Sequence, residues 1–295
     1  MKVSYIIVWA NTNSLVKMNP TDYPNKNIDV DNALLKHTLF LIDQLLQLQP
    51  HEILVMDNEG NFPKQDNPLI RVIPSFQTFD FASEDYQDPY WIHELGLLDY
   101  KGMYIPRKGG NKPHIKKLNA AMVTAMAYNH GIVEATGDYL VLQHNDTEYL
   151  FDRYSEKEVI HDAINLLERE NYEYITVDKK PPKGNSPYGY DYFADCYWFL
   201  CRGDFYQKHR IWVDWTRGDT NHLATIMCEK KGLKYLHLPG FYENKTHLKM
   251  EFFEKYNIKT PGNLHILNDK PFLHHMKGGT GLYNILKRGS VHETD

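Results

Sequence analysis

Cysteines, long apolar runs and basic runs are all scarce in this sequence. Its three cysteines, Cys196, Cys201 and Cys228, are odd in number and lack the paired spacing of a metal site. That usage argues against a disulfide scaffold and favours a reducing compartment, so we expect a cytoplasmic protein. The apolar segment 3–10 is too short for a signal peptide. No stretch approaches the roughly 20 apolar residues of a membrane helix, so we expect no membrane span.

The charge balance excludes another class of partner. The chain has 33 Lys and Arg against 38 Asp and Glu, a formal net charge of −5. Nucleic acid and anionic membrane surfaces select a positive surface, so neither is expected as the main partner. With 295 residues, 42% of them hydrophobic, the chain can bury one large core.

The hydrophobic pattern predicts alternating strands and helices. Apolar runs rich in β-branched residues predict strands at 3–9, 52–56, 69–73, 138–142, 174–177, 196–200 and 235–238. Helical spacing predicts helices over 34–46, 115–126, 159–167 and 219–231, the second ending near 129–131. Ser155 and Glu158 have the spacing of a capping box for the third helix. The order strand–helix–strand–strand at the start is typical of an α/β fold with an open parallel sheet.

Polar groups gather where the fourth predicted strand ends. His144, Asn145 and Asp146 directly follow 138–142. In open α/β sheets, ligands bind outside the carboxyl ends of the strands. Mg²⁺ and Mn²⁺ prefer hard oxygen ligands and keep positions open for phosphate oxygens. Asp146 is therefore a candidate ligand for a divalent ion.

Three motifs around this strand resemble the central block of glycosyltransferase family 2. They are Asn-His-Gly-Ile at 129–132, Ala-Thr-Gly-Asp-Tyr at 135–139 and Asn-Asp-Thr-Glu at 145–148, the last similar to a rhamnosyltransferase-like branch. The resemblance implies a GT-A (nucleotide-diphospho-sugar transferase) fold, a Rossmann-like, mostly parallel sheet flanked by helices. It also implies inverting, Mn²⁺- or Mg²⁺-dependent transfer of a sugar from a nucleotide-diphosphate sugar to a carbohydrate or glycoconjugate acceptor.

The same resemblance implies a set of metal ligands. Asp146 matches the second Asp of the family's D-x-D motif, and His144 stands at the first. Neutral imidazole can bind Mn²⁺, although it brings no negative charge. Family members place a histidine after the last strand, which favours His275 as a further ligand over His274 and over His247.

The remaining implied roles concern the nucleotide and the acceptor. Asn11, Asp57, Asn145 and Lys277 would bind the nucleotide sugar. Asp219 would be the general base that deprotonates the acceptor hydroxyl, with Asp214 a competing candidate. The chain 1–295 would form one GT-A-like domain with three parts, listed by role: a nucleotide-sugar half (1–150), an acceptor half (151–250) and an extension that closes over the site (251–295).

Plainer interpretations compete with these. Asp57 can close its strand through an Asx turn, Asp219 can be a helix N-cap, and Asn129 with Gly131 can form a helix C-cap. For the whole chain, the rivals are a sugar-nucleotide pyrophosphorylase-like enzyme and a non-catalytic carbohydrate-binding protein on a decayed transferase scaffold. The pyrophosphorylase should carry a Gly-rich loop after its first strand, and residues 9–13 have none. The missing acidic residue at His144 keeps the second rival open.

Overall fold

A computed structural model describes residues 1–10, 28–75, 120–177, 193–213, 221–243 and 262–275. Within them the main strands are β1 (Val3–Trp9), β2 (Glu52–Asp57), β3 (Ile70–Pro74), β4 (Tyr139–Gln143), β6 (Tyr174–Thr176), β7 (Trp198–Arg202) and β8 (Leu236–His237). The helices are α2 (Ile28–Gln47), α4 (Ala120–Glu134), α5 (Val159–Arg169), α6 (Phe205–His209) and α7 (His222–Lys231). None of these helices has the length and apolar character to cross a bilayer.

The seven main strands form one sheet in the order β3-β2-β1-β4-β7-β6-β8. β3, β2, β1 and β4 are parallel, β7 runs antiparallel to both its neighbours, and β6 pairs with β8 in parallel. The expected α/β fold with a mostly parallel sheet is therefore confirmed. All seven side chains of β1 are buried, as in a strand that is covered on both faces.

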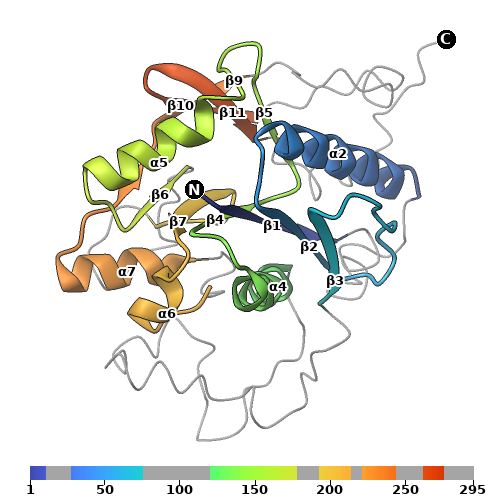
Figure 1. The fold of residues 1–295 in the computed structure, drawn as a ribbon, viewed down its shortest axis with the longest axis horizontal. Helices are drawn as coiled ribbons and strands as arrows, with labels where there is room; N and C mark the ends of the chain where they lie inside the picture. The colour runs from blue at the N-terminus through green and yellow to red at the C-terminus, as the bar shows by residue number, and fades with distance from the viewer. Residues whose placement is uncertain (11–27, 76–119, 178–192, 214–220, 244–261, 276–295) are drawn as a thin grey trace, which may run out of the picture.

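Helices cover both faces of this sheet. Figure 1 shows α2 and α5 on one side and α4, α6 and α7 on the other. Alternate residues of β1 divide between the two cores: Tyr5 and Ile7 pack in the α2/α5 core, and Ile6 and Val8 pack in the α4/α7 core.

A second, antiparallel sheet lies beside the first core. It joins β5 (Thr147–Tyr149), β11 (Lys270–His275), β10 (Gly262–Leu267) and β9 (Gly240–Glu243), in that order. Residues beyond 250 carry no strand in the sequence-based prediction, so β10 and β11 are additions from the structure.

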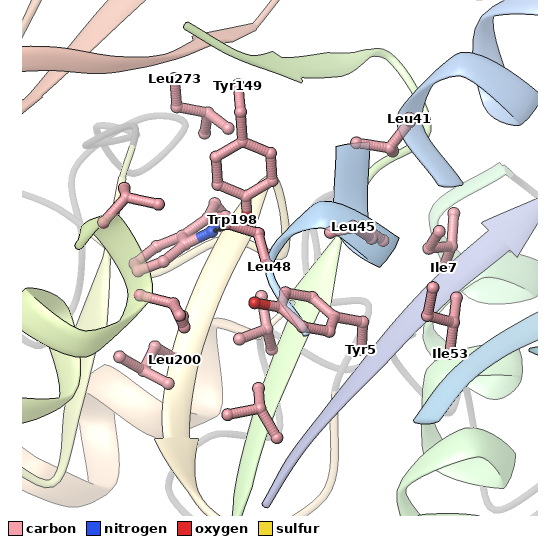
Figure 2. Close-up of a cluster of buried hydrophobic side chains, with 14 of the residues drawn as sticks. Tyr5, Ile7, Leu41, Leu45, Leu48, Ile53, Tyr149, Trp198, Leu200 and Leu273 are labelled. Atoms are coloured by element: carbon pink, nitrogen blue, oxygen red, sulfur yellow. Dashed lines mark hydrogen bonds between the residues drawn. The ribbon is translucent and has the colours of Figure 1, made fainter. Parts of the chain in front are cut away.

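The first core ties the two sheets together. Figure 2 shows Tyr149 of β5 and Trp198 of β7 between the main sheet and Leu273 of β11. Trp198 donates its indole N–H to the Tyr149 hydroxyl at 2.9 Å, and its ring meets Phe272 edge to face, with ring centroids 5.3 Å apart. The second sheet is thus fixed to the first by apolar packing and by a buried hydrogen bond.

Two helix ends differ from the sequence-based prediction. Helix α4 continues to Glu134 instead of ending near 129–131, so the C-cap interpretation of Asn129 and Gly131 is wrong. The Asn129 amide bonds the backbone of Val213 instead, accepting from its N–H and donating to its carbonyl. A Cβ on Gly131 would lie 2.5 Å from Ile6 Cγ2, so the helix needs glycine there to approach β1.

The predicted capping box of α5 is also wrong. The helix begins at Val159 with Glu158 at the N-cap, and Glu158 makes no side-chain cap bond. Ser155 lies one turn earlier, where its carbonyl accepts the N–H groups of Glu158 and Val159. Ser155 and Glu158 have the sequence spacing of a capping box, but these residues form the turn that precedes α5.

A buried carboxylate fastens the amino ends of the parallel strands. Glu52 Oε1 accepts hydrogen bonds from the Ser4 hydroxyl at 2.7 Å and from the Thr136 N–H at 2.6 Å. Its other oxygen accepts from Arg71 at 3.1 Å. Burial raises the pKa of Glu52, but the donors from Ser4, Thr136 and Arg71 outweigh it, so the pKa lies below its ordinary value.

We predict that Glu52→Gln lowers the free energy of unfolding at pH 7 by about 1–3 kcal/mol, because the charged acceptor for Arg71 is lost. The folded-state pKa of Glu52 is depressed, so its contribution is present above the unfolded-state pKa and is lost as the pH falls through the folded value. The deficit of the variant should therefore shrink in urea titrations carried from pH 7 to pH 3. Glu156→Gln is the control, because Glu156 lies in the turn before α5 and takes no part in these hydrogen bonds. A deficit that is constant across this range would contradict the assignment.

Candidate metal centre

The strand order places the predicted motif at a crevice in the sheet. β1 pairs with β2 on one side and with β4 on the other: the chain runs outward from β1 to β2 and β3, and the connection after β3 then returns past β1 to β4. Such a switch point opens a crevice at the carboxyl ends of the strands. β4 ends at Gln143, and the residues that follow it, 144–146, lie at this edge.

Three side chains converge there. His144 Nδ1 lies 3.7 Å from Asp146 Oδ1, and His275 Nε2 lies 3.6 Å from Asp146 Oδ2. One ligand atom from each of the three lies within 4.8 Å of the others. These separations are longer than hydrogen bonds and close to the roughly 3–3.5 Å between ligand atoms that share an ion at about 2.1 Å. Two imidazoles and one carboxylate are a donor set that fits a divalent transition metal.

His275 reaches the cluster through strand pairing. β11 pairs with β5 in a register that sets His275 opposite Thr147 and His274 opposite Glu148. His274 Nδ1 and Glu148 Oε1 form a buried pair at 2.8 Å. The two histidines therefore have different surroundings: His275 lies beside Asp146, and His274 is engaged by Glu148 behind it.

Two tyrosines line the ligand histidines. The ring of Tyr197 lies 3.8 Å from that of His275 and 4.6 Å from that of His144, measured between centroids. The backbone carbonyl of Tyr197 also accepts a hydrogen bond from the backbone N–H of His144 at 3.2 Å. Tyr128 of α4 lies nearly parallel to His144, with centroids 6.2 Å apart and an angle of 11° between the rings. These contacts restrict the orientation of both imidazoles.

The ligand loop is anchored to α2. The Asn145 amide donates to the Thr38 hydroxyl at 3.2 Å, and His37 Nε2 bonds the Thr147 carbonyl at 3.1 Å. Thr147 in turn donates its hydroxyl to the His144 carbonyl at 2.7 Å. Burial lowers the pKa of His37, and the nearby charges of Glu148 and Asp146 act in the opposite direction.

The other predicted site residues fare differently. The Asp57 carboxylate accepts the N–H groups of Glu59, Gly60 and Phe62, each at 2.9 Å, which is the turn-closing role. Its contact with a nucleotide stays a prediction, as does any ligand contact of Asn145.

Several predicted residues lie outside the described part of the chain: Asn11, Asp214, Asp219, His247 and Lys277. Within the described residues, helix α7 begins at His222 with Asn221 as its N-cap, and the role of Asp219 stays a prediction.

The sequence-based analysis missed the residues that support the three ligands. No sequence motif includes Tyr128, Tyr197 or His37, so nothing in the sequence marked them as neighbours of the ligands. Glu148, which pairs with His274, belongs to the Asn-Asp-Thr-Glu motif at 145–148, and that motif was the available signal for it. The partners of these residues come from other elements, which no local pattern specifies.

Comparison with known proteins gives weak structural likenesses. No protein-family model matches the sequence. No curated protein matches it either. A solved structure of S. aureus TarS has 12% identity and a TM-score of 0.33, covering 72% of this chain and 50% of that chain, so this chain spans half the length of the TarS fragment.

Two further solved structures show likenesses of the same order. UDP-glucose pyrophosphorylase from Acinetobacter baumanii has 9% identity and a TM-score of 0.37, covering 80% of this chain and 86% of its own. The 4-diphosphocytidyl-2C-methyl-D-erythritol synthase from Anaerococcus prevotii has 10% identity and a TM-score of 0.32, and the match covers 80% of this chain and 88% of the synthase. At such scores, the fold class rests on the sheet topology of the chain itself.

We predict that Asp146→Asn weakens Mn²⁺ binding at least tenfold, because the carboxylate is the only anionic member of the cluster. Isothermal titration of Mn²⁺ into the metal-stripped protein measures this. Asp152→Asn removes the same charge from a side chain that is 78% exposed and outside the cluster, so it should bind like the unmodified protein. Equal affinity for all three proteins would place the ion elsewhere.

Proposed function

We propose that this protein is a metal-dependent glycosyltransferase that uses a nucleotide-diphosphate sugar as donor. The observation that carries the proposal is the convergence of His144, Asp146 and His275 at the carboxyl edge of the sheet, beside the β1/β4 switch point. Nucleotides bind at that edge in open α/β sheets, and a cation there can neutralise a diphosphate. The resemblance to glycosyltransferase family 2, and to its rhamnosyltransferase-like branch, supports the same assignment.

The protein's own groups would prepare the site for a diphosphate. Asp146 and the two histidines would hold the ion, which when bound supplies positive charge to the leaving diphosphate. Tyr197 keeps both imidazole rings in place, and Glu148 fixes the neighbouring His274. Asp219 remains our proposed general base for the acceptor hydroxyl, which would give inverting transfer.

The donor set bears on which ion is used. Mg²⁺ favours oxygen ligands and several waters, whereas imidazole suits transition metals. A cluster with two histidines and one carboxylate therefore favours Mn²⁺ or a later transition metal over Mg²⁺.

A thermal-shift screen of UDP-, GDP- and dTDP-sugars, each with and without Mn²⁺, tests the proposal. A donor at about 100 times its dissociation constant adds roughly 2.7 kcal/mol, which should raise the melting temperature by about 5 °C. The shift should require Mn²⁺ and be lost in Asp146→Asn but kept in Asp152→Asn. If no nucleotide sugar raises the melting temperature with any metal, the proposal fails.

Product analysis separates the proposed activity from its rivals. A transferase should slowly hydrolyse the donor that binds, releasing the nucleoside diphosphate, and the anomeric configuration of the freed sugar shows whether transfer inverts. A pyrophosphorylase should instead release pyrophosphate from a nucleoside triphosphate and a sugar 1-phosphate. Binding without either reaction would favour the non-catalytic carbohydrate-binding protein.

A further inference from the structure

Tyr128 presents a buried hydroxyl beside the metal cluster. Its side chain is fully buried, and among the described residues its hydroxyl has no hydrogen-bond partner. Its ring lies along His144, and the charges of Asp195 and Asp146 act on it. A buried donor left unsatisfied costs about 1–3 kcal/mol, so such a group calls for an explanation.

The surroundings of Tyr128 favour a neutral donor. Burial raises the pKa of Tyr128 well above its ordinary value, and the acidic neighbours act in the same direction. Any tyrosine hydroxyl carries its proton at neutral pH and can donate it in a hydrogen bond. In this poorly solvated place, an anionic oxygen is the acceptor that gains most from it.

We propose that the Tyr128 hydroxyl donates a hydrogen bond to a phosphate oxygen of the diphosphate bound at the cluster of His144, Asp146 and His275. This inference rests on the proposed function, since it assigns Tyr128 to the ligand that the cluster would hold. Tyr128 is then a binding residue on the α4 side of the site, whereas the three cluster residues come from the β4–β5 loop and from β11. The ion would attract the diphosphate by its charge, and the Tyr128 hydroxyl would orient it through a directional hydrogen bond.

The chain contains a matched control for this role. Tyr5 of β1 is also fully buried, and among the described residues its hydroxyl likewise has no hydrogen-bond partner. Its side chain packs in the other core, the α2/α5 core, which Figure 2 shows. Replacing either tyrosine with phenylalanine keeps the ring and removes one unsatisfied hydroxyl. Neither change should lower the melting temperature of the ligand-free protein.

The experiment uses inorganic pyrophosphate as the probe, because it carries the diphosphate without a base or a sugar. Mn²⁺ alone, and pyrophosphate at saturating Mn²⁺, are titrated calorimetrically into the full chain and into Tyr128→Phe and Tyr5→Phe. We expect Tyr128→Phe to bind Mn²⁺ within twofold of the unmodified protein and pyrophosphate about tenfold more weakly. Tyr5→Phe should match the unmodified protein in both titrations.

The outcomes separate this proposal from the one on which it rests. If the unmodified protein binds Mn²⁺ and pyrophosphate and Tyr128→Phe binds both equally well, the role of Tyr128 is refuted and the diphosphate site stands. An equal loss in Tyr5→Phe also refutes it, because the effect would then follow from removal of any buried hydroxyl. If the unmodified protein binds no pyrophosphate with Mn²⁺, both proposals fail together.

Discussion

The pairing of β11 with β5 is the constraint on which the candidate site depends. Residues 144–146 leave β4 close to one another, but a cluster of three ligands needs His275, which only this pairing brings within 3.6 Å of Asp146. A slip of one residue would turn His275 to the opposite face of the strand and put His274 in its place. The buried His274–Glu148 pair and the packing of Leu273 and Phe272 under Trp198 both resist such a slip.

Burial gives this cluster its chemical character. The Asp146 side chain is 13% exposed and that of His275 is 1% exposed, so little water shares the charge of the carboxylate. The imidazoles of His144 and His275 lie beside the carboxylate, and Tyr197 packs against both rings. A carboxylate in such surroundings gains from a positive partner, and a divalent ion provides one without requiring a proton to be taken up.

The sequence predicts those parts of the fold that depend on local patterns. The parallel strands, α2, α5 and the position of the motif after β4 follow from apolar periodicity and from residue order. The extent of α4 does not, because Gly131 breaks the local helical pattern while its missing side chain lets the helix pack on Ile6. β10 and β11 pair with each other across Asn268 and Asp269, which both have positive φ, so this hairpin carried a local turn signal that the sequence-based prediction did not use. His275 could be named as a ligand only through a family resemblance, and its place opposite Thr147 emerges from the structure.

The route of the chain through the site also bears on its biosynthesis. Glu148 and its partner His274 are 126 residues apart in sequence. A ribosome therefore completes the main sheet's β1–β4 core long before the strand that carries His274 and His275 leaves the exit tunnel. A nascent chain would hold the loop after β4 with only two of the cluster's three donors. The third proposed ligand, His275, thus joins the other two only when the second sheet has formed.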